Sequence, residues 1–266
     1  MRRNRLTYLI FFALIAMIAS CQKVISLKLD NSAPQLVIEG NLTDVYGIQY
    51  VVITKSVPFT STNTFPRVTG ASVSITDDST GYVFKFHEDT TGVYSYYPMV
   101  GLAGRKYIMT VKTGGQVYTA SSTMPQLVNL DSITAKISSF GNSDLRTITV
   151  NYQDPASIAN QYRFVLNVNH KPSGTIFAFD DSFTNGRYVR QDLFENGTDI
   201  NNQDTVSVEM QCIDRNIYEY WYSLSQQQQN GPGGGTTPSN PPSNFDNNAL
   251  GYFSAHTTES RVIIVN

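Results

Sequence analysis

Short runs in which apolar and polar residues alternate fill the chain from Gln35 onward. In residues 71–77, for example, Ala71, Val73 and Ile75 fall on one side of an extended strand and polar residues on the other. The runs are rich in Val, Ile, Thr, Tyr and Phe, and clusters of Gly, Asp, Asn or Ser interrupt them about every eight to twelve residues. This spacing predicts an all-β protein.

Seven strands are predicted in the first half of the chain, and glycine-containing turns separate several of them. The predicted ranges are 35–43, 48–57, 71–77, 82–87, 93–97, 106–113 and 116–122. Seven strands in so short a stretch suit a β-sandwich of immunoglobulin-like or prealbumin-like type. We therefore assign residues 35–124 to an N-terminal β-sandwich domain.

A second β-rich domain is predicted over residues 125–266, beginning after Met124. Its predicted strands are 132–138, 145–152, 162–169, 175–179 and 205–213, with two further strands at 249–255 and 261–265 that close the second sheet. One helix is predicted near residues 214–226, where Asp214 can act as the cap and apolar residues recur at helical spacing. The Gln-, Gly- and Pro-rich segment near residues 227–248 has little apolar area to bury, which predicts a flexible loop.

The first 20 residues have the three parts of a secretory signal peptide. Three arginines come first, then an apolar run over residues 6–18, then small residues ahead of Cys21. A run of 13 residues is too short for a transmembrane helix, which needs about 20. A cleaved signal peptide over residues 1–20 is therefore favoured over an uncleaved anchor.

The tetrapeptide Ile18-Ala19-Ser20-Cys21 resembles a bacterial lipobox. It predicts cleavage between Ser20 and Cys21, with diacylglycerol on the Cys21 thiol and a fatty acid such as palmitate on the freed amine. Two or more acyl chains hold a protein stably on a membrane, whereas a single chain is marginal. Cys21 is thus the predicted membrane anchor, and residues 21–34 are the predicted lipidated tether.

Charge and cysteine content narrow the choice of partners. Without the leader, the chain has 16 Lys and Arg against 21 Asp and Glu, a net charge of −5, which argues against nucleic acid as a partner. Lipidation of Cys21 leaves Cys212 without a disulfide partner. Cys212 shares a strand face with Val208 and Met210 and has no neighbouring His or Lys, so we expect a buried, unreactive thiol.

No local motif in the sequence indicates catalysis or metal binding. His87, His170 and His256 lie in separate segments without other ligands at suitable spacing. The sequence has neither a Gly-x-Ser-x-Gly elbow nor a phosphate-binding loop. We therefore predict a protein that is not an enzyme, with no catalytic residue, metal or cofactor. A hydrolase whose site is assembled from distant residues is kept as an alternative.

Aromatic residues are abundant, and most of them fit a core. Tyr97, Tyr220 and Tyr222 fall outside the predicted packing faces and are candidate exposed residues for binding. Exposed rings of this kind stack against sugars or protein partners. A second alternative is therefore an independent cell-surface lipoprotein that binds carbohydrate or acts as an adhesin through these tyrosines.

Several segments together resemble one protein family. They are Cys21-Gln22-Lys23, Leu36-Val37-Ile38-Glu39-Gly40, Val68-Thr69-Gly70-Ala71-Ser72-Val73, Gly92-Val93-Tyr94 and Leu250-Gly251-Tyr252-Phe253-Ser254-Ala255. Over nearly all of its mature length, the chain is similar to the Bacteroidetes lipoproteins catalogued as domain of unknown function 4249 (DUF4249). The resemblance brings no catalytic residues with it. It implies a lipid-anchored outer-membrane protein that faces either the periplasm or the cell surface, often encoded beside a TonB-dependent β-barrel receptor.

The leading hypothesis from the sequence is therefore a non-enzymatic binding or accessory subunit. The lipid on Cys21 is expected to attach it to the membrane. Its expected protein partner is a TonB-dependent receptor that captures nutrients. The carbohydrate-binding adhesin and the hydrolase are the two alternatives.

Overall fold

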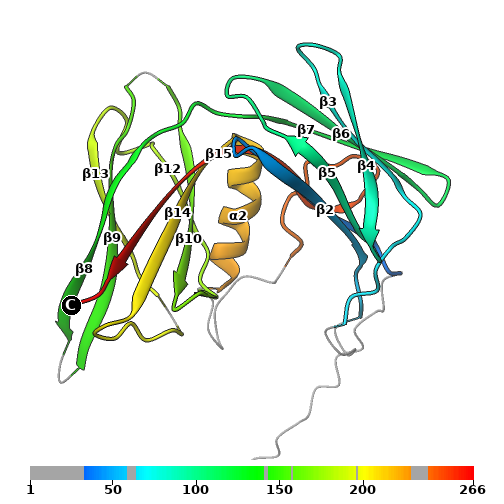
Figure 1. Cartoon of the computed structure of the whole chain (residues 1–266). Coiled ribbons are helices and arrows are strands. Elements are labelled where there is room, and N and C mark those ends of the chain that lie inside the picture. The colour runs from blue at the N-terminus through cyan, green and yellow to red at the C-terminus, as the bar shows by residue number, and fades with distance from the viewer. Residues whose placement is uncertain (1–32, 59–63, 141–142, 157, 196, 229–238) are drawn as a thin grey trace, which may run out of the picture. The chain divides into compact units, whose positions relative to one another are not determined.

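Two β-sheets and one helix make up the part of the chain that the computed structural model describes (Figure 1). The described residues are 33–266, apart from 59–63, 141–142, 157, 196 and 229–238. The predicted all-β fold is confirmed. The predicted signal peptide, Ser20, Cys21 and nearly all of the tether lie outside the described residues.

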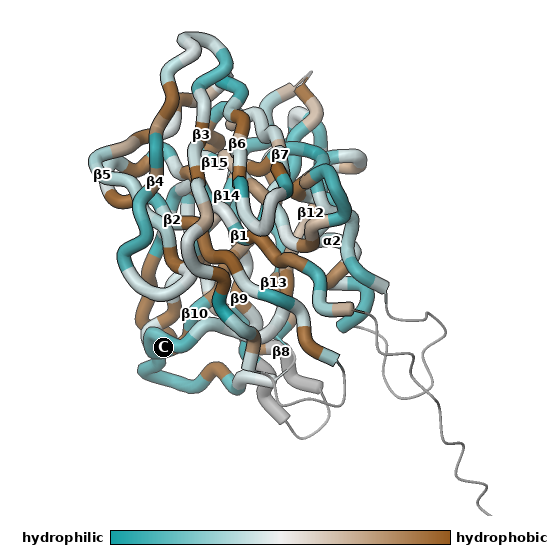
Figure 2. Tube along the Cα trace, turned by 90° about the vertical axis from the view of Figure 1, so that its right-hand side faces the viewer, coloured by the Kyte–Doolittle hydropathy of each residue, from teal (hydrophilic) through white to brown (hydrophobic). Residues whose placement is uncertain are grey.

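The first half contains seven strands that follow the seven predicted ranges closely. They are β1 Leu36–Thr43, β2 Gly47–Lys55, β3 Ser72–Asp77, β4 Val83–Thr90, β5 Val93–Met99, β6 Lys106–Thr113 and β7 Gln116–Thr123. They lie in the order β1-β2-β5-β4-β3-β6-β7, each antiparallel to the next. The expected faces of β3 are confirmed, because Val73 and Ile75 are buried and Ser72 is exposed. Hydrophobic and hydrophilic positions alternate along the strands in Figure 2, as a half-buried sheet requires.

The second half adds seven strands, five of which were predicted. They are β8 Leu130–Phe140, β9 Ser143–Gln153, β10 Gln161–Val168, β11 Lys171–Pro172, β12 Phe177–Asp180, β13 Tyr188–Leu193 and β14 Thr205–Ile213. β13, β9 and β8 form a separate three-stranded sheet in that order, and the other four belong to the twelve-stranded sheet. Apolar residues from both sheets, including Val150, Phe164 and Met210, form a core of the sandwich type.

The last strand, β15 (Leu250–Ile264), takes part in both halves of Pro34–Asn266, which form one compact unit. Its first part runs parallel to β1, with Ile38 opposite Gly251, and its second part runs antiparallel to β14. The prediction of two separate strands here was wrong. His256 and Thr257, which lie between the two predicted strands, are buried within one continuous strand.

Two hydrophobic cores divide the chain, and the first of them also includes residues from near the C-terminus. The first core draws its described residues from β1–β7 and also from the C-terminal segment, which adds Phe245, Ala249, Phe253 and Ala255. Phe245 lies in the segment predicted to be a flexible loop. The neighbouring Asn244 amide hydrogen-bonds the backbone of Phe253 in both directions, at 2.8 and 2.9 Å, and fixes this end of the segment against β15.

The predicted helix is confirmed as α2 (Arg215–Gln228), which packs on β12, β10 and β15. The Asp214 carboxylate accepts a hydrogen bond from the Ile217 N–H at 3.1 Å, as the predicted N-cap should. Its other oxygen accepts hydrogen bonds from the Ser122 hydroxyl at 2.6 Å and the Thr123 N–H at 3.1 Å. Asp214 therefore links the start of the helix to the end of β7.

Candidate binding site

A cavity of about 740 Å³ lies between β12 of the large sheet, β13 of the small sheet and the C-terminal part of α2. Its volume falls within the range typical of small-molecule and peptide sites. The lining residues are Gly174, Thr175, Ile176, Phe177, Ala178, Phe179, Gln191, Asp192, Phe194, Tyr222, Ser225, Gln226 and Gln228. We call this space the edge cavity, because β12 and β13 each lie at the edge of their sheet.

The β12 side of the edge cavity consists of six successive residues, 174–179. Side chains of a strand point alternately to opposite faces, so a cavity above one face of a sheet contacts every second residue. Contact with successive residues shows that the edge cavity runs along the backbone edge of this segment. The site therefore presents main-chain groups as well as side chains.

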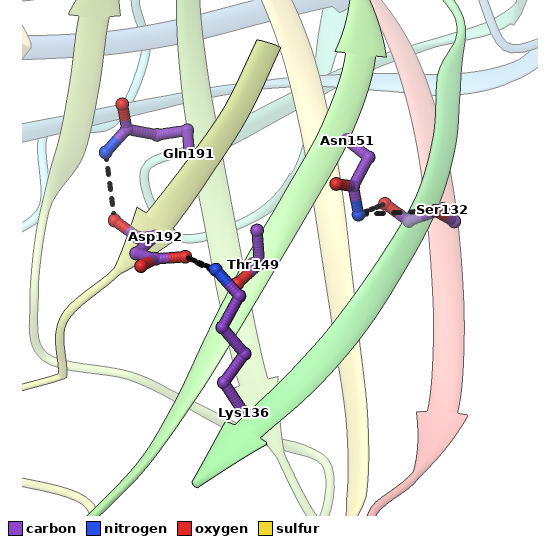
Figure 3. Close-up of polar contacts among 6 residues, drawn as sticks. All are labelled: Ser132, Lys136, Thr149, Asn151, Gln191 and Asp192. Carbon is purple, nitrogen blue, oxygen red and sulfur yellow. Dashed lines mark hydrogen bonds and ion pairs between the residues drawn. The ribbon is translucent and has the colours of Figure 1, made fainter. Parts of the chain in front are cut away.

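The β13 side carries a carboxylate that is already engaged (Figure 3). The Asp192 carboxylate pairs with the Lys136 ammonium at 3.0 Å and accepts a hydrogen bond from the Thr149 hydroxyl at 2.5 Å. The hydrogen bond from Thr149, with the charge of Lys136, holds the pKa of Asp192 below its ordinary value. Asp192 is thus ionised and satisfied by residues of β8 and β9, which leaves it poorly suited to act as a general base.

Two aromatic rings at the edge cavity are open to solvent. Phe194, just after β13, is 63% exposed, and Tyr222 on α2 is 43% exposed. Tyr222 stacks on Tyr218 with ring centroids 5.3 Å apart, so its position on the helix is supported from one side. These rings offer apolar contact area at the rim of a site whose interior contains amide groups.

The three tyrosines singled out in the sequence have different environments. Tyr222 lines the edge cavity, whereas Tyr97 lies on β5, is 61% exposed and contacts the Tyr46 ring edge-on at 6.2 Å. The prediction that Tyr220 is exposed was wrong, because it is only 8% exposed and packs against Tyr252 at 4.9 Å. Because α2 packs on three strands, β10, β12 and β15, it buries more of its surface than the single apolar face that the sequence predicts, and Tyr220 lies in that additional buried part.

A polar cluster lies on the sheet under α2. The Arg163 guanidinium sits 3.7 Å from the centre of the Trp221 ring and donates a hydrogen bond to Gln211 at 3.0 Å. On β15, the Ser254 hydroxyl and Nδ1 of His256 are 2.9 Å apart. Burial, with the positive charge of Arg163, lowers the pKa of His256 to about 4. His256 is therefore neutral at pH 7 and sits among residues that fix α2 to the sheet.

Cys212 on β14 is the buried thiol that the sequence predicts. It is free and buried, and its sulfur accepts a hydrogen bond from the Val128 N–H at 3.4 Å. Burial raises the pKa of this thiol, so the unreactive thiol form is favoured.

In the ranges that the structure covers, no three His, Cys, Asp or Glu side chains are grouped so that they could hold a metal ion. No helix in the same ranges has the length and apolar character needed to cross a membrane.

Comparison with known proteins identifies one family. Residues 22–261 match the family model described as domain of unknown function 4249, which agrees with the resemblance found in the sequence. No curated protein matches the chain.

Proposed function

The chain belongs to the DUF4249 family, and from this premise we propose that it is a lipid-anchored, non-enzymatic binding subunit of the outer membrane. In this proposal it acts as an accessory to a TonB-dependent β-barrel receptor that captures nutrients. The folded part faces either the periplasm or the cell surface. Lipid on Cys21 holds it to the membrane.

The edge cavity is the observation that carries the proposal. Two exposed rings, Phe194 and Tyr222, and the glutamine amides of β13 and α2 line it, while Asp192 is neutralised by Lys136. Such a lining can hold a ligand by apolar contact and hydrogen bonding. The proposal therefore assigns this site to recognition.

The N-terminal sequence supports the membrane part of the proposal. The lipobox-like tetrapeptide ends at Cys21, and β1 begins at Leu36. The 14 intervening residues span at most about 50 Å when fully extended. A lipid on Cys21 would thus keep the start of the folded unit within about 50 Å of the membrane surface.

Replacement of Cys21 by serine tests the anchor. We expect Cys21→Ser to move nearly all of the protein from the membrane pellet to the soluble fraction, because no acyl chain can then be attached. Cys212→Ser is the matched control, since Cys212 is buried in the second core, and it should stay in the pellet. Retention of Cys21→Ser in the pellet after a carbonate wash would contradict the proposed anchor.

Purification from detergent-solubilised outer membranes tests the partner. At native expression, we expect an affinity-tagged chain to bring down one large β-barrel protein in stoichiometric amount. Mass spectrometry of the eluate would identify that protein. Recovery of the lipoprotein alone, under conditions that preserve other envelope complexes, would exclude a stable receptor partnership.

A further inference from the structure

Building on the proposed function, we infer that the edge cavity binds an uncharged, extended peptide segment of a partner protein, which pairs with β12 as an additional strand. In this mode of recognition, main-chain hydrogen bonds supply affinity, and pockets for alternate side chains supply specificity. At the two sheet edges that border the cavity, the hydrogen-bonding directions of the backbone favour such pairing.

The register of β12 on β10 leaves part of its backbone unpaired toward the cavity. Hydrogen-bonded and non-hydrogen-bonded pairs alternate along antiparallel strands. The Asp181 N–H donates to the Asn160 carbonyl at 3.1 Å, and Ala178 lies opposite Arg163 in the same register. Ala178 is therefore at a non-hydrogen-bonded position, and its N–H and C=O point away from β10 toward the open edge.

A glutamine side chain already occupies one part of this edge as a peptide group would. The Gln228 amide donates to the Gly174 carbonyl at 2.8 Å and accepts from the Ile176 N–H at 3.0 Å. In a parallel sheet, a residue donates its N–H to one carbonyl of the neighbouring strand and accepts from the N–H two residues further along that strand. The Gln228 amide makes the same pair of contacts. The backbone just before β12 thus accepts an amide from outside its sheet.

The β13 edge, across the cavity, also has an outward-facing carbonyl that a glutamine amide contacts. The Asp154 N–H donates to the Arg187 carbonyl at 2.9 Å, which places Asp192 at an outward-facing position of the same ladder. The Asp192 carbonyl accepts a hydrogen bond from the side-chain amide of its neighbour Gln191 at 3.0 Å (Figure 3). At the β12 edge the Gln228 amide takes the place of a missing strand, and at the β13 edge the Gln191 amide satisfies one outward carbonyl. A bound peptide can displace such an amide without leaving a buried group unpaired.

The side chains at the rim define what the peptide carries. Phe194 and Tyr222 are exposed rings that suit an apolar side chain, and the Asp192 carboxylate already has Lys136 as its counter-ion. No lining residue of the cavity is basic. An uncharged peptide with an apolar residue therefore fits better than an acidic one. The outward main-chain groups of Gly174, Ile176 and Ala178 recur at every second residue, a spacing that matches a polypeptide strand better than the hydroxyls of a sugar.

Proline at position 178 tests strand addition directly. Ala178→Pro removes the outward N–H and fills the space beside it, while the ladder to β10 is kept, because an edge strand tolerates proline where its N–H is unpaired. Ala178→Gly is the matched control, since it changes the same residue and keeps the N–H. Both are made in the full-length lipoprotein, purified in detergent.

The probe is the tightest binder from an array of random 12-residue peptides, labelled and titrated by fluorescence polarisation. We expect Ala178→Pro to weaken binding at least tenfold, because one hydrogen bond is lost and its partner on the peptide is left unpaired, and Ala178→Gly to stay within about twofold of the parent. Hydrogen exchange of the Ala178 amide should slow when the peptide binds. If Ala178→Pro fails to fold, the double variant Phe194→Ser with Tyr222→Ser replaces it, with the same tenfold loss expected.

Three outcomes would overturn the inference: no peptide binds, Ala178→Pro in folded form binds as tightly as the parent, or oligosaccharides bind at the cavity in place of peptides. These outcomes are separate from the proposed receptor partnership. If the barrel co-purifies equally with the parent and with Ala178→Pro, the partnership stands and strand addition at β12 is excluded. If a peptide binds as expected but no barrel co-purifies, the edge site stands and the receptor partnership fails.

Discussion

Replacement of Gly251 by alanine is expected to lower the free energy of unfolding by about 2 to 5 kcal/mol. A Cβ at this position would lie 2.0 Å from the Ile38 carbonyl oxygen, where β15 runs beside β1. Gly251 also has φ +91°, a conformation that side chains disfavour. Relief of the contact requires the two strands to separate, and both of them contribute to the first core through Ile38 and Phe253.

Urea denaturation of the mature chain carrying Cys21→Ser measures this effect. A loss of this size is a large part of the roughly 5 to 15 kcal/mol that stabilises a typical protein. Gly47→Ala is the matched control, because a Cβ there has no atom within 4 Å, and it should change the unfolding free energy by less than about 1 kcal/mol. Equal unfolding midpoints for Gly251→Ala and the parent would show that the close approach of β1 and β15 is wrong.

Stability is expected to fall by about 3 kcal/mol as the pH decreases from about 6.5 to about 4, through His256 alone. Burial and the charge of Arg163 lower the pKa of His256 to about 4 in the folded chain, against an ordinary value of 6.5. Between these values the unfolded chain binds a proton that the folded chain excludes. The contribution of neutral His256 to the free energy of unfolding is therefore fully present above about pH 6.5 and is lost as the pH falls toward about 4.

The unfolding free energy of His256→Gln, followed from pH 7 to pH 4, isolates this contribution. The glutamine can still hydrogen-bond Ser254 but cannot be protonated, so the variant should lose about 3 kcal/mol less than the parent over this interval. His87→Gln, which replaces an exposed imidazole paired with Asp89 at 2.7 Å, is the control for the substitution itself at pH 7, where it should change the unfolding free energy by less than about 1 kcal/mol. Identical pH slopes for His256→Gln and the parent would contradict a buried, neutral His256.

Most strands could be predicted from the sequence, because apolar and polar residues alternate along them. β13 could not, since Arg190, Gln191 and Asp192 interrupt its apolar pattern and it pairs on one side only. The sequence predicts two strands in place of β15, because hydropathy does not identify polar residues that are buried with hydrogen-bond partners. His256 hydrogen-bonds Ser254 inside the strand that seemed to end there.

The edge cavity was largely beyond sequence reasoning. Its lining comes from the segment before and within β12, from the end of β13 and from α2, and no local motif joins these three. Tyr222 alone was singled out in advance, as an aromatic residue off the predicted packing face. The sequence does not identify the glutamines as cavity residues, because their role depends on the backbone groups that their amides contact in the fold.

The shared strand β15 sets the order in which the chain can complete its fold. β1, near the start of the folded unit, has β2 on one side and residues 250–256 on the other. Until those late residues have been made, the first core lacks Phe253 and Ala255, and β1 is an open edge. An emerging chain therefore cannot finish its first half before its second. The topology therefore requires that the unpaired edge of β1 be protected from other chains, either by a chaperone or by rapid completion of synthesis.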